Sequence, residues 1–217
     1  MSGDVQVRFC ERLGVQLPRA THPVLGFQHR EDATRLLLEL QERMVKFGLE
    51  LHPEKTRLIE FGRYAAERRR LRGEGSPEPF NFLGFTHICG THRKTGHFII
   101  TRTTISKRMA AKLRQIQAEL RRRMHDSLAE TVKWLQSVVR GYFQYHAIPG
   151  NEERLRAFRK DVLRLWLRQL RRRSQRSRWT WERFQAIFGV LLPDVGILHP
   201  YPDTRFDARI RGRNRVR

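Results

Sequence analysis

The sequence has no run of 18 or more apolar residues, so it contains no candidate transmembrane helix. The first residues also lack the apolar stretch of an export signal, which favours a cytoplasmic protein. Cysteine is scarce, since Cys10 and Cys89 are the only two among 217 residues. In an unexported chain such a distant pair favours free thiols over a disulfide. Hydrophobic residues nevertheless make up 39% of the chain, with 13 Phe and 4 Trp, which is enough for folded cores.

Acidic residues are few relative to basic ones. The chain has 22 Asp and Glu against 44 Lys and Arg, which gives a formal net charge of +22. Between Arg154 and Arg178, eleven Arg or Lys stand against one acid, Asp161, while apolar residues keep helical spacing. A helix with a cationic outer face and a packed inner face suits a polyanion, and nucleic acid is the favoured one. A solubilising basic surface is the alternative, and an anionic lipid surface is a weaker one.

The first part of the chain predicts a leader followed by a helix. Residues 1–26 show little periodicity, and Pro18 and Pro23 would break a helix, so we expect a poorly ordered leader. Apolar residues then recur at helical spacing over 33–47, and Gly48 suits the left-handed position that ends many helices.

Short strands and loops are predicted next. Residues 49–51 and 57–61 alternate between apolar and polar as strands do. The charged and then Gly-, Ser- and Pro-rich segment 64–79 predicts a surface loop or linker. Strands at 80–87 and 97–101, separated by a glycine-flanked turn, predict a β-hairpin.

The second half predicts a small helical bundle. Apolar residues at helical spacing mark a first helix over 105–124, and Ser127 with Glu130 forms a capping box that opens a second. A third helix begins near Asn151 and a short fourth one near Thr180. The fold class expected for the whole chain is therefore α+β, with a helix, strands and a hairpin followed by an Arg-rich bundle.

The bundle supplies cationic and aromatic side chains suited to RNA. Arginine donates two parallel hydrogen bonds to phosphate, and unpaired bases stack on aromatic rings. For each aromatic ring, packing in the core is the alternative. The candidate RNA-binding residues are Lys107, Arg108, Lys112, Arg114, Arg121, Arg122, Arg123, Arg140, Tyr142, Tyr145, Arg171, Arg172, Arg173, Arg178 and Trp179.

A metal or catalytic site is not predicted. The cluster of His87, Cys89, His92 and His97 has residue types that bind zinc, but its spacing fits no closed structural zinc site. The carboxylates are scattered and include no acid/base pair at helical or strand register. We therefore assign no catalytic residue and no metal ligand.

Five short motifs resemble, in order and spacing, one family. They are Leu-Glu-Leu-His-Pro-Glu-Lys-Thr at 49–56, Phe-Gly at 61–62, Phe-Leu-Gly-Phe-Thr-His at 82–87, Arg-Gly-Tyr-Phe-Gln-Tyr-His at 140–146 and Trp-Thr-Trp-Glu-Arg-Phe at 179–184. Over about residues 26–206 the chain resembles the C-terminal part of group II intron-encoded reverse transcriptases, which ends in the maturase domain.

The resemblance implies a division of the chain into four parts. After the leader 1–26 come a palm remnant at 27–101, a maturase-specific helical domain at 102–190 and a basic C-terminal tail at 191–217. A primer-grip-like hairpin is implied at Phe82, Leu83, Gly84 and Phe85.

The chain departs from the family where catalysis is expected. The Tyr-Ala-Asp-Asp stretch, whose carboxylates hold Mg²⁺, corresponds to Arg-Ala-Thr-His at 19–22, and the fingers and remaining palm would precede Met1. We therefore expect a fragment that binds RNA, above all group II intron RNA, and aids splicing without polymerase activity. DNA is a further candidate polyanion. The alternatives are a non-functional gene remnant or the downstream half of a split polymerase, with an upstream reverse-transcriptase half as partner and Mg²⁺ as cofactor.

Overall fold

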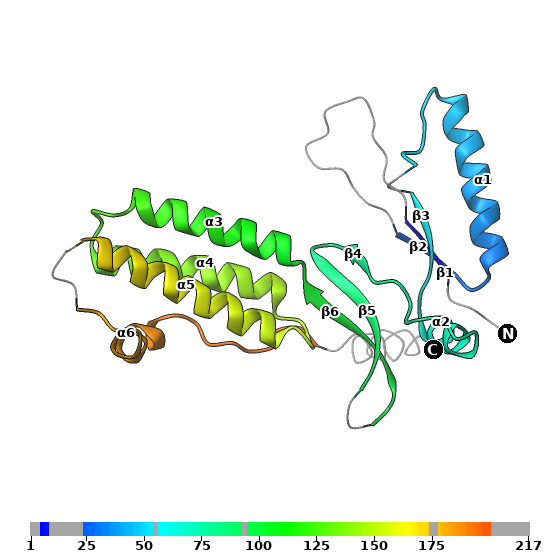
Figure 1. Ribbon diagram of the computed structural model, residues 1–217. Coiled ribbons are helices and arrows are strands. Elements are labelled where there is room, and N and C mark those ends of the chain that lie inside the picture. Colours follow the sequence, from blue (N-terminus) through cyan, green and yellow to red (C-terminus); the bar gives the residue numbers. More distant parts are fainter. Residues whose placement is uncertain (1–4, 9–23, 54–55, 93–94, 174–177, 201–217) are drawn as a thin grey trace, which may run out of the picture. The chain divides into compact units, whose positions relative to one another are not determined.

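A computed structural model describes residues 5–8, 24–53, 56–92, 95–173 and 178–200, the first segment by its backbone alone (Figure 1). The chain divides into two compact units, Met1–Thr101 and Arg102–Arg217. Helices and antiparallel strands are both present, so the α+β class predicted from the sequence is confirmed.

Unit 1 contains an antiparallel sheet with the order β2-β1-β3. Its strands are β1 (Val5–Arg8), β2 (Val24–Phe27) and β3 (Arg57–Glu60). The prediction of a poorly ordered leader is wrong for β1 and β2, because β1 pairs with a strand on each side. Pro18 and Pro23 lie outside the described residues.

The predicted first helix is confirmed as α1 (Arg30–Lys46). Gly48 has a φ of 68°, and the N–H groups of Gly48 and Leu49 donate to the carbonyls of Val45 and Met44. This bond pattern closes the helix end and needs a residue that tolerates the left-handed conformation. The prediction of a strand at 49–51 is wrong, because only Leu51 forms a bridge. The strand β3 pairs with β1 and not with this segment.

The loop predicted at 64–79 is wrong in its first part, which forms the helix α2 (Arg63–Leu71). Arg68 and Arg72, one helical turn apart, both form ion pairs with Glu60 at the end of β3, at 3.0 and 2.9 Å. A charged segment without an apolar stripe is thus held in place by a carboxylate on another element.

A second sheet contains β4 (Phe80–Phe82), β5 (Phe85–Thr91) and β6 (Phe98–Thr104), in that order. The single strand predicted at 80–87 is wrong. Leu83 and Gly84 have φ values of 45° and 85° and form a two-residue turn, across which Phe82 pairs with Phe85. Two successive positive φ values are typical of tight hairpins, whose twist they match.

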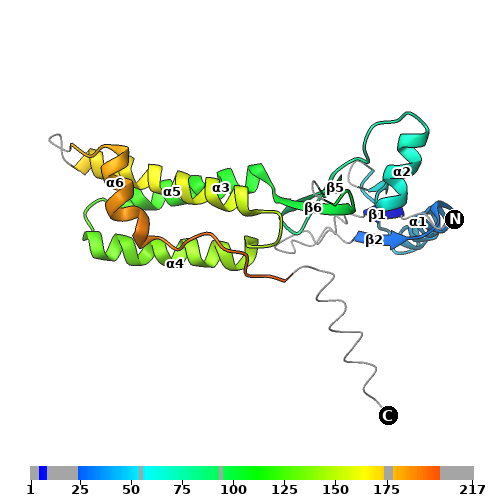
Figure 2. The same cartoon turned by 90° about the horizontal axis from the view of Figure 1, so that it is seen from below.

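Unit 2 is the predicted helical bundle, made of α3 (Ser106–Arg122), α4 (Leu128–His146), α5 (Glu152–Arg173), α6 (Trp181–Phe188) and a 3-10 turn, Gly189–Leu191. The helices α3, α4 and α5 run side by side (Figures 1 and 2). The capping box at Ser127 and Glu130 is confirmed. The core contains Trp166, Phe158 and Phe184, each at most 1% exposed. Among the described residues, none of the helices is long and apolar enough to cross a membrane.

Two polar residues fasten connections within unit 2. Asn151, fully buried, accepts the Thr104 N–H at 2.9 Å and donates to the Thr104 hydroxyl and the His146 carbonyl, each at 2.8 Å. Arg159 on α5 donates to the carbonyls of Gly189, Leu192 and Pro193. The basic tail predicted from 191 onward is therefore wrong for 191–200, because Arg159 and the buried Leu192 hold this segment on the bundle. Residues 201–217 lie outside the described part.

Candidate nucleic-acid interface

A pocket with a volume of about 390 Å³ opens between α3 and α4 in unit 2. Two cationic side chains one turn apart come from α3, and small, apolar and aromatic side chains come from α4. The lining residues are Arg108, Lys112, Ser137, Val138, Gly141, Tyr142, Tyr145 and His146. The structure thus brings together four of the RNA-binding candidates predicted from the sequence, namely Arg108, Lys112, Tyr142 and Tyr145.

The two tyrosines of the pocket differ in exposure. Tyr142 is 7% exposed, and its ring stacks on Phe158 and His146 with centroid separations of 3.6 and 4.0 Å. Tyr145, three residues later on α4, is 50% exposed. Tyr142 therefore belongs to the core and forms the floor of the pocket, whereas the Tyr145 ring has a surface that a base from solvent can reach.

The positive charge of the pocket comes from α3. Burial lowers the pKa of His146 more than its hydrogen bond to the Tyr142 carbonyl raises it, and the nearby Arg108 charge lowers it further, which favours the neutral imidazole. The His146 Nδ1 lies 3.0 Å from the Tyr142 carbonyl oxygen. Arg108 is exposed and Lys112 half-buried, and neither forms an ion pair within the described part of the chain.

The remaining α3 and α4 candidates fall into two groups. Glu119 pairs with Arg122 and Arg123, and these partners lower the pKa of Glu119 to about 2, so part of their charge is compensated. Arg123 also pairs with Asp126 and stacks over Trp134. The second group is exposed and forms no ion pair with a described carboxylate: Lys107, Arg114, Arg121 and Arg140.

Part of the cationic cluster predicted at the end of α5 forms hydrogen bonds within the chain. Arg171 donates two hydrogen bonds to the Trp179 carbonyl, and Arg173 donates to the Arg123 carbonyl at 3.0 Å. The Trp179 ring is half-buried and packs edge-on against Phe184 and Phe188. These three residues therefore have structural roles, while Arg172 and Arg178 are exposed and form no ion pair with a described carboxylate.

Four residues of the pocket, Ser137, Val138, Gly141 and His146, are absent from the sequence-based candidates. A spacing signal for two of them exists in the sequence, because Ser137, Gly141 and Tyr145 follow one another at four-residue intervals on α4. Such a row lies along one side of a helix. The row by itself does not indicate a pocket, because the other side of the pocket comes from Arg108 and Lys112 on α3.

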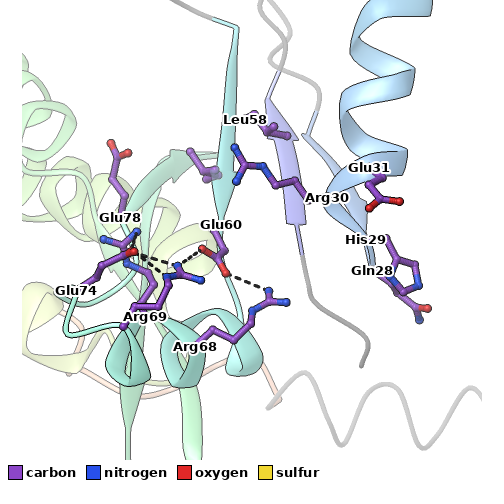
Figure 3. A pocket seen from close by; sticks show the side chains of 12 residues that line it. Gln28, His29, Arg30, Glu31, Leu58, Glu60, Arg68, Arg69, Glu74 and Glu78 are labelled. Atoms are coloured by element: carbon purple, nitrogen blue, oxygen red, sulfur yellow. Dashed lines mark hydrogen bonds and ion pairs between the residues drawn. The ribbon is translucent and has the colours of Figure 1, made fainter.

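A larger cavity of about 720 Å³ lies in unit 1, between the start of α1, β3 and α2 (Figure 3). Its cations are Arg30 at the start of α1 and three arginines in and just after α2. Carboxylates compensate these three: Glu60 pairs with Arg68 and Arg72, and Glu74 with Arg69 and Arg72. These ion pairs lower the attraction of the cavity for a polyanion, so the α3–α4 pocket is the better candidate.

The primer-grip-like residues lie around the turn between β4 and β5. Leu83 is 64% exposed at the turn, Phe82 is half-buried, and Gly84 and Phe85 are buried. The nearby candidate zinc ligands are dispersed. His87 stacks on Phe80, whereas Cys89 is buried and accepts the Gly62 N–H at 3.4 Å. Burial raises the pKa of the Cys89 thiol. Within the described residues no group of three or more His, Cys, Asp or Glu could hold a metal.

The stability of unit 2 should fall in alkali because of Tyr142. Burial raises the pKa of Tyr142 from 10.0 to about 12, so the folded state retains a proton that the unfolded state loses. This stabilisation amounts to about 3 kcal/mol. It is fully present below about pH 10 and is lost as pH rises through about 12. Urea unfolding at several pH values measures it, and Tyr142→Phe should abolish this part of the pH dependence. An equal dependence in both proteins would contradict the assignment.

Comparison with known proteins adds no relative: no family model matches the chain, and no curated protein matches it significantly.

Proposed function

We propose that the chain is a cytoplasmic, maturase-like RNA-binding protein that binds structured RNA through unit 2, with group II intron RNA as its partner and without polymerase activity of its own. The observation that carries this proposal is the uncompensated positive charge of α3 and α4 around a pocket with an exposed aromatic ring. The maturase assignment is supported by the resemblance of the five sequence motifs.

A contrast between two helices of equal length supports the location of the interface. Over its 17 residues, α1 carries four basic and four acidic side chains, whereas α3 carries six basic side chains and one acid, Glu119. A mixed surface has little net field, but a surface of one sign attracts a phosphate backbone. The α3 surface is therefore the one suited to a polyanion.

The decisive experiment removes this charge without touching the core. Replacing Lys107, Arg114, Arg121 and Arg140 with Gln should weaken binding to a structured RNA hairpin and make the slope of log affinity against log salt less steep by about 3. Fluorescence anisotropy at several salt concentrations measures both quantities. The four side chains are exposed and form no described ion pair, so thermal melting should change little.

A matched variant removes the same number of charges from unit 1. Replacing Arg30, Arg35, Arg43 and Lys46 of α1 with Gln lowers the net charge equally, yet should leave most of the RNA affinity in place. Equal losses in the two variants would show that binding depends on net charge alone, and would contradict an interface on unit 2.

A further inference from the structure

The pocket between α3 and α4 combines an apolar interior with a cationic edge. We propose that it holds one unpaired nucleotide of RNA, with the base against Tyr145 and a flanking phosphate at Arg108 and Lys112. This inference rests on the proposed function, because it assigns one subsite within the RNA-binding surface.

The interior of the pocket suits the face of a base. Val138, Gly141 and the buried Tyr142 ring form its apolar part, and the half-exposed Tyr145 ring lies on the same helix. Stacking on an aromatic ring is a usual way in which proteins bind unpaired bases. The volume of about 390 Å³ lies at the lower end of the range for small-ligand sites, about 300 to 1,000 Å³.

Gly141 points to a ligand independently of the aromatic rings. It lies inside α4, where glycine is less favourable than alanine, and apart from its chain neighbours and the backbone of α4 itself no atom lies within 4 Å of the position that a Cβ would occupy. Packing within the chain therefore does not require glycine there. The missing side chain leaves open the space that a flat ring beside Tyr145 would fill.

The charges of the pocket favour a nucleotide over a neutral aromatic ligand. Arg108 and Lys112 are one turn apart on α3, and no described carboxylate pairs with either. A guanidinium and an ammonium at the edge of an apolar site suit a base that carries a phosphate. A base inside a duplex presents no open face, so the pocket should select RNA with an unpaired nucleotide.

Filling the pocket tests the inference. The probes are an RNA hairpin with one bulged nucleotide and a fully paired hairpin of the same length, with affinities measured by fluorescence anisotropy. The native chain should prefer the bulged hairpin by about 10-fold, as expected for one stacked base. Gly141→Leu should abolish this preference, because it fills the pocket without removing charge.

Control variants separate the pocket from the stability of the helix. Ala129→Leu adds the same side chain to an exposed position of α4 outside the pocket and should keep the preference. Tyr145→Ala should lose it and Tyr145→Phe should retain it, which keeps the inference testable if Gly141→Leu does not fold. Equal binding of both hairpins by the native chain, or a preference that survives Gly141→Leu, would overturn the inference but not RNA binding. Failure to bind either hairpin would overturn the proposed function itself.

Discussion

Raising the salt concentration from about 50 to about 200 mM should weaken RNA binding by about 1,000-fold. Each phosphate contact adds about −0.7 to −0.9 to the slope of log affinity against log salt, so six contacts give roughly −5. The exposed cations of unit 2 that form no ion pair with a described carboxylate include Lys107, Arg108, Arg114, Arg121, Arg140 and Arg172, which are enough for six such contacts. A titration of a labelled RNA hairpin in increasing potassium chloride measures the slope.

The charge variants test whether this salt dependence arises from the surface of α3 and α4. The chain with Gln at 107, 114, 121 and 140 should retain a slope of roughly −2, and the chain with four Gln on α1 should keep roughly −5. A slope near zero for the native chain would mean that phosphate contacts do not drive binding, and the proposed interface would fail with it.

Truncation of Phe158 should destabilise unit 2 by about 3 to 5 kcal/mol, the cost of emptying a fully packed aromatic site. The Phe158 side chain is 0% exposed, and its ring lies against Tyr142 with centroids 3.6 Å apart. All four tryptophans of the chain lie in unit 2, so urea unfolding followed by tryptophan fluorescence reports on this unit. Phe158→Ala should move the midpoint to a much lower urea concentration.

An exposed apolar residue provides the control for the truncation. Val190 is 77% exposed, and Val190→Ala should change the free energy of unfolding by no more than about 0.5 kcal/mol. Because Phe158 supports the Tyr142 floor of the pocket, its truncation should also reduce the preference for bulged RNA. Unchanged unfolding in Phe158→Ala would contradict the packing of α4 on α5.

The helices of unit 2 could be predicted because their signals are local. The bundle helices follow apolar residues at helical spacing, and α4 begins where Ser127 and Glu130 bond each other's backbone N–H groups. In α1, Gly48 allows the closing hydrogen bonds at the helix end. In each case the interacting groups lie within a turn or two of one another, so the order of residues alone determines whether they can meet.

Helix α2 and the turn at Leu83 could not be predicted in the same way. The helix has no apolar stripe, and the carboxylate that holds its arginines, Glu60, comes from a strand outside it. The turn places a leucine at a positive φ, which a leucine in a sequence does not signal. Pairing of β4 with β5 compensates for this backbone conformation, and that pairing exists only in the folded chain.

By itself, the sequence determined the α+β class, the helices of the bundle and the excess of positive charge. Only the tertiary structure decided which cations remain for a ligand: Arg159 and Arg173 donate to carbonyls 30 or more residues away, while Arg108 and Lys112 stay at the edge of a pocket. The physical reason is that helix periodicity acts over a few residues, whereas hydrogen bonding and burial depend on groups that only the complete fold brings together.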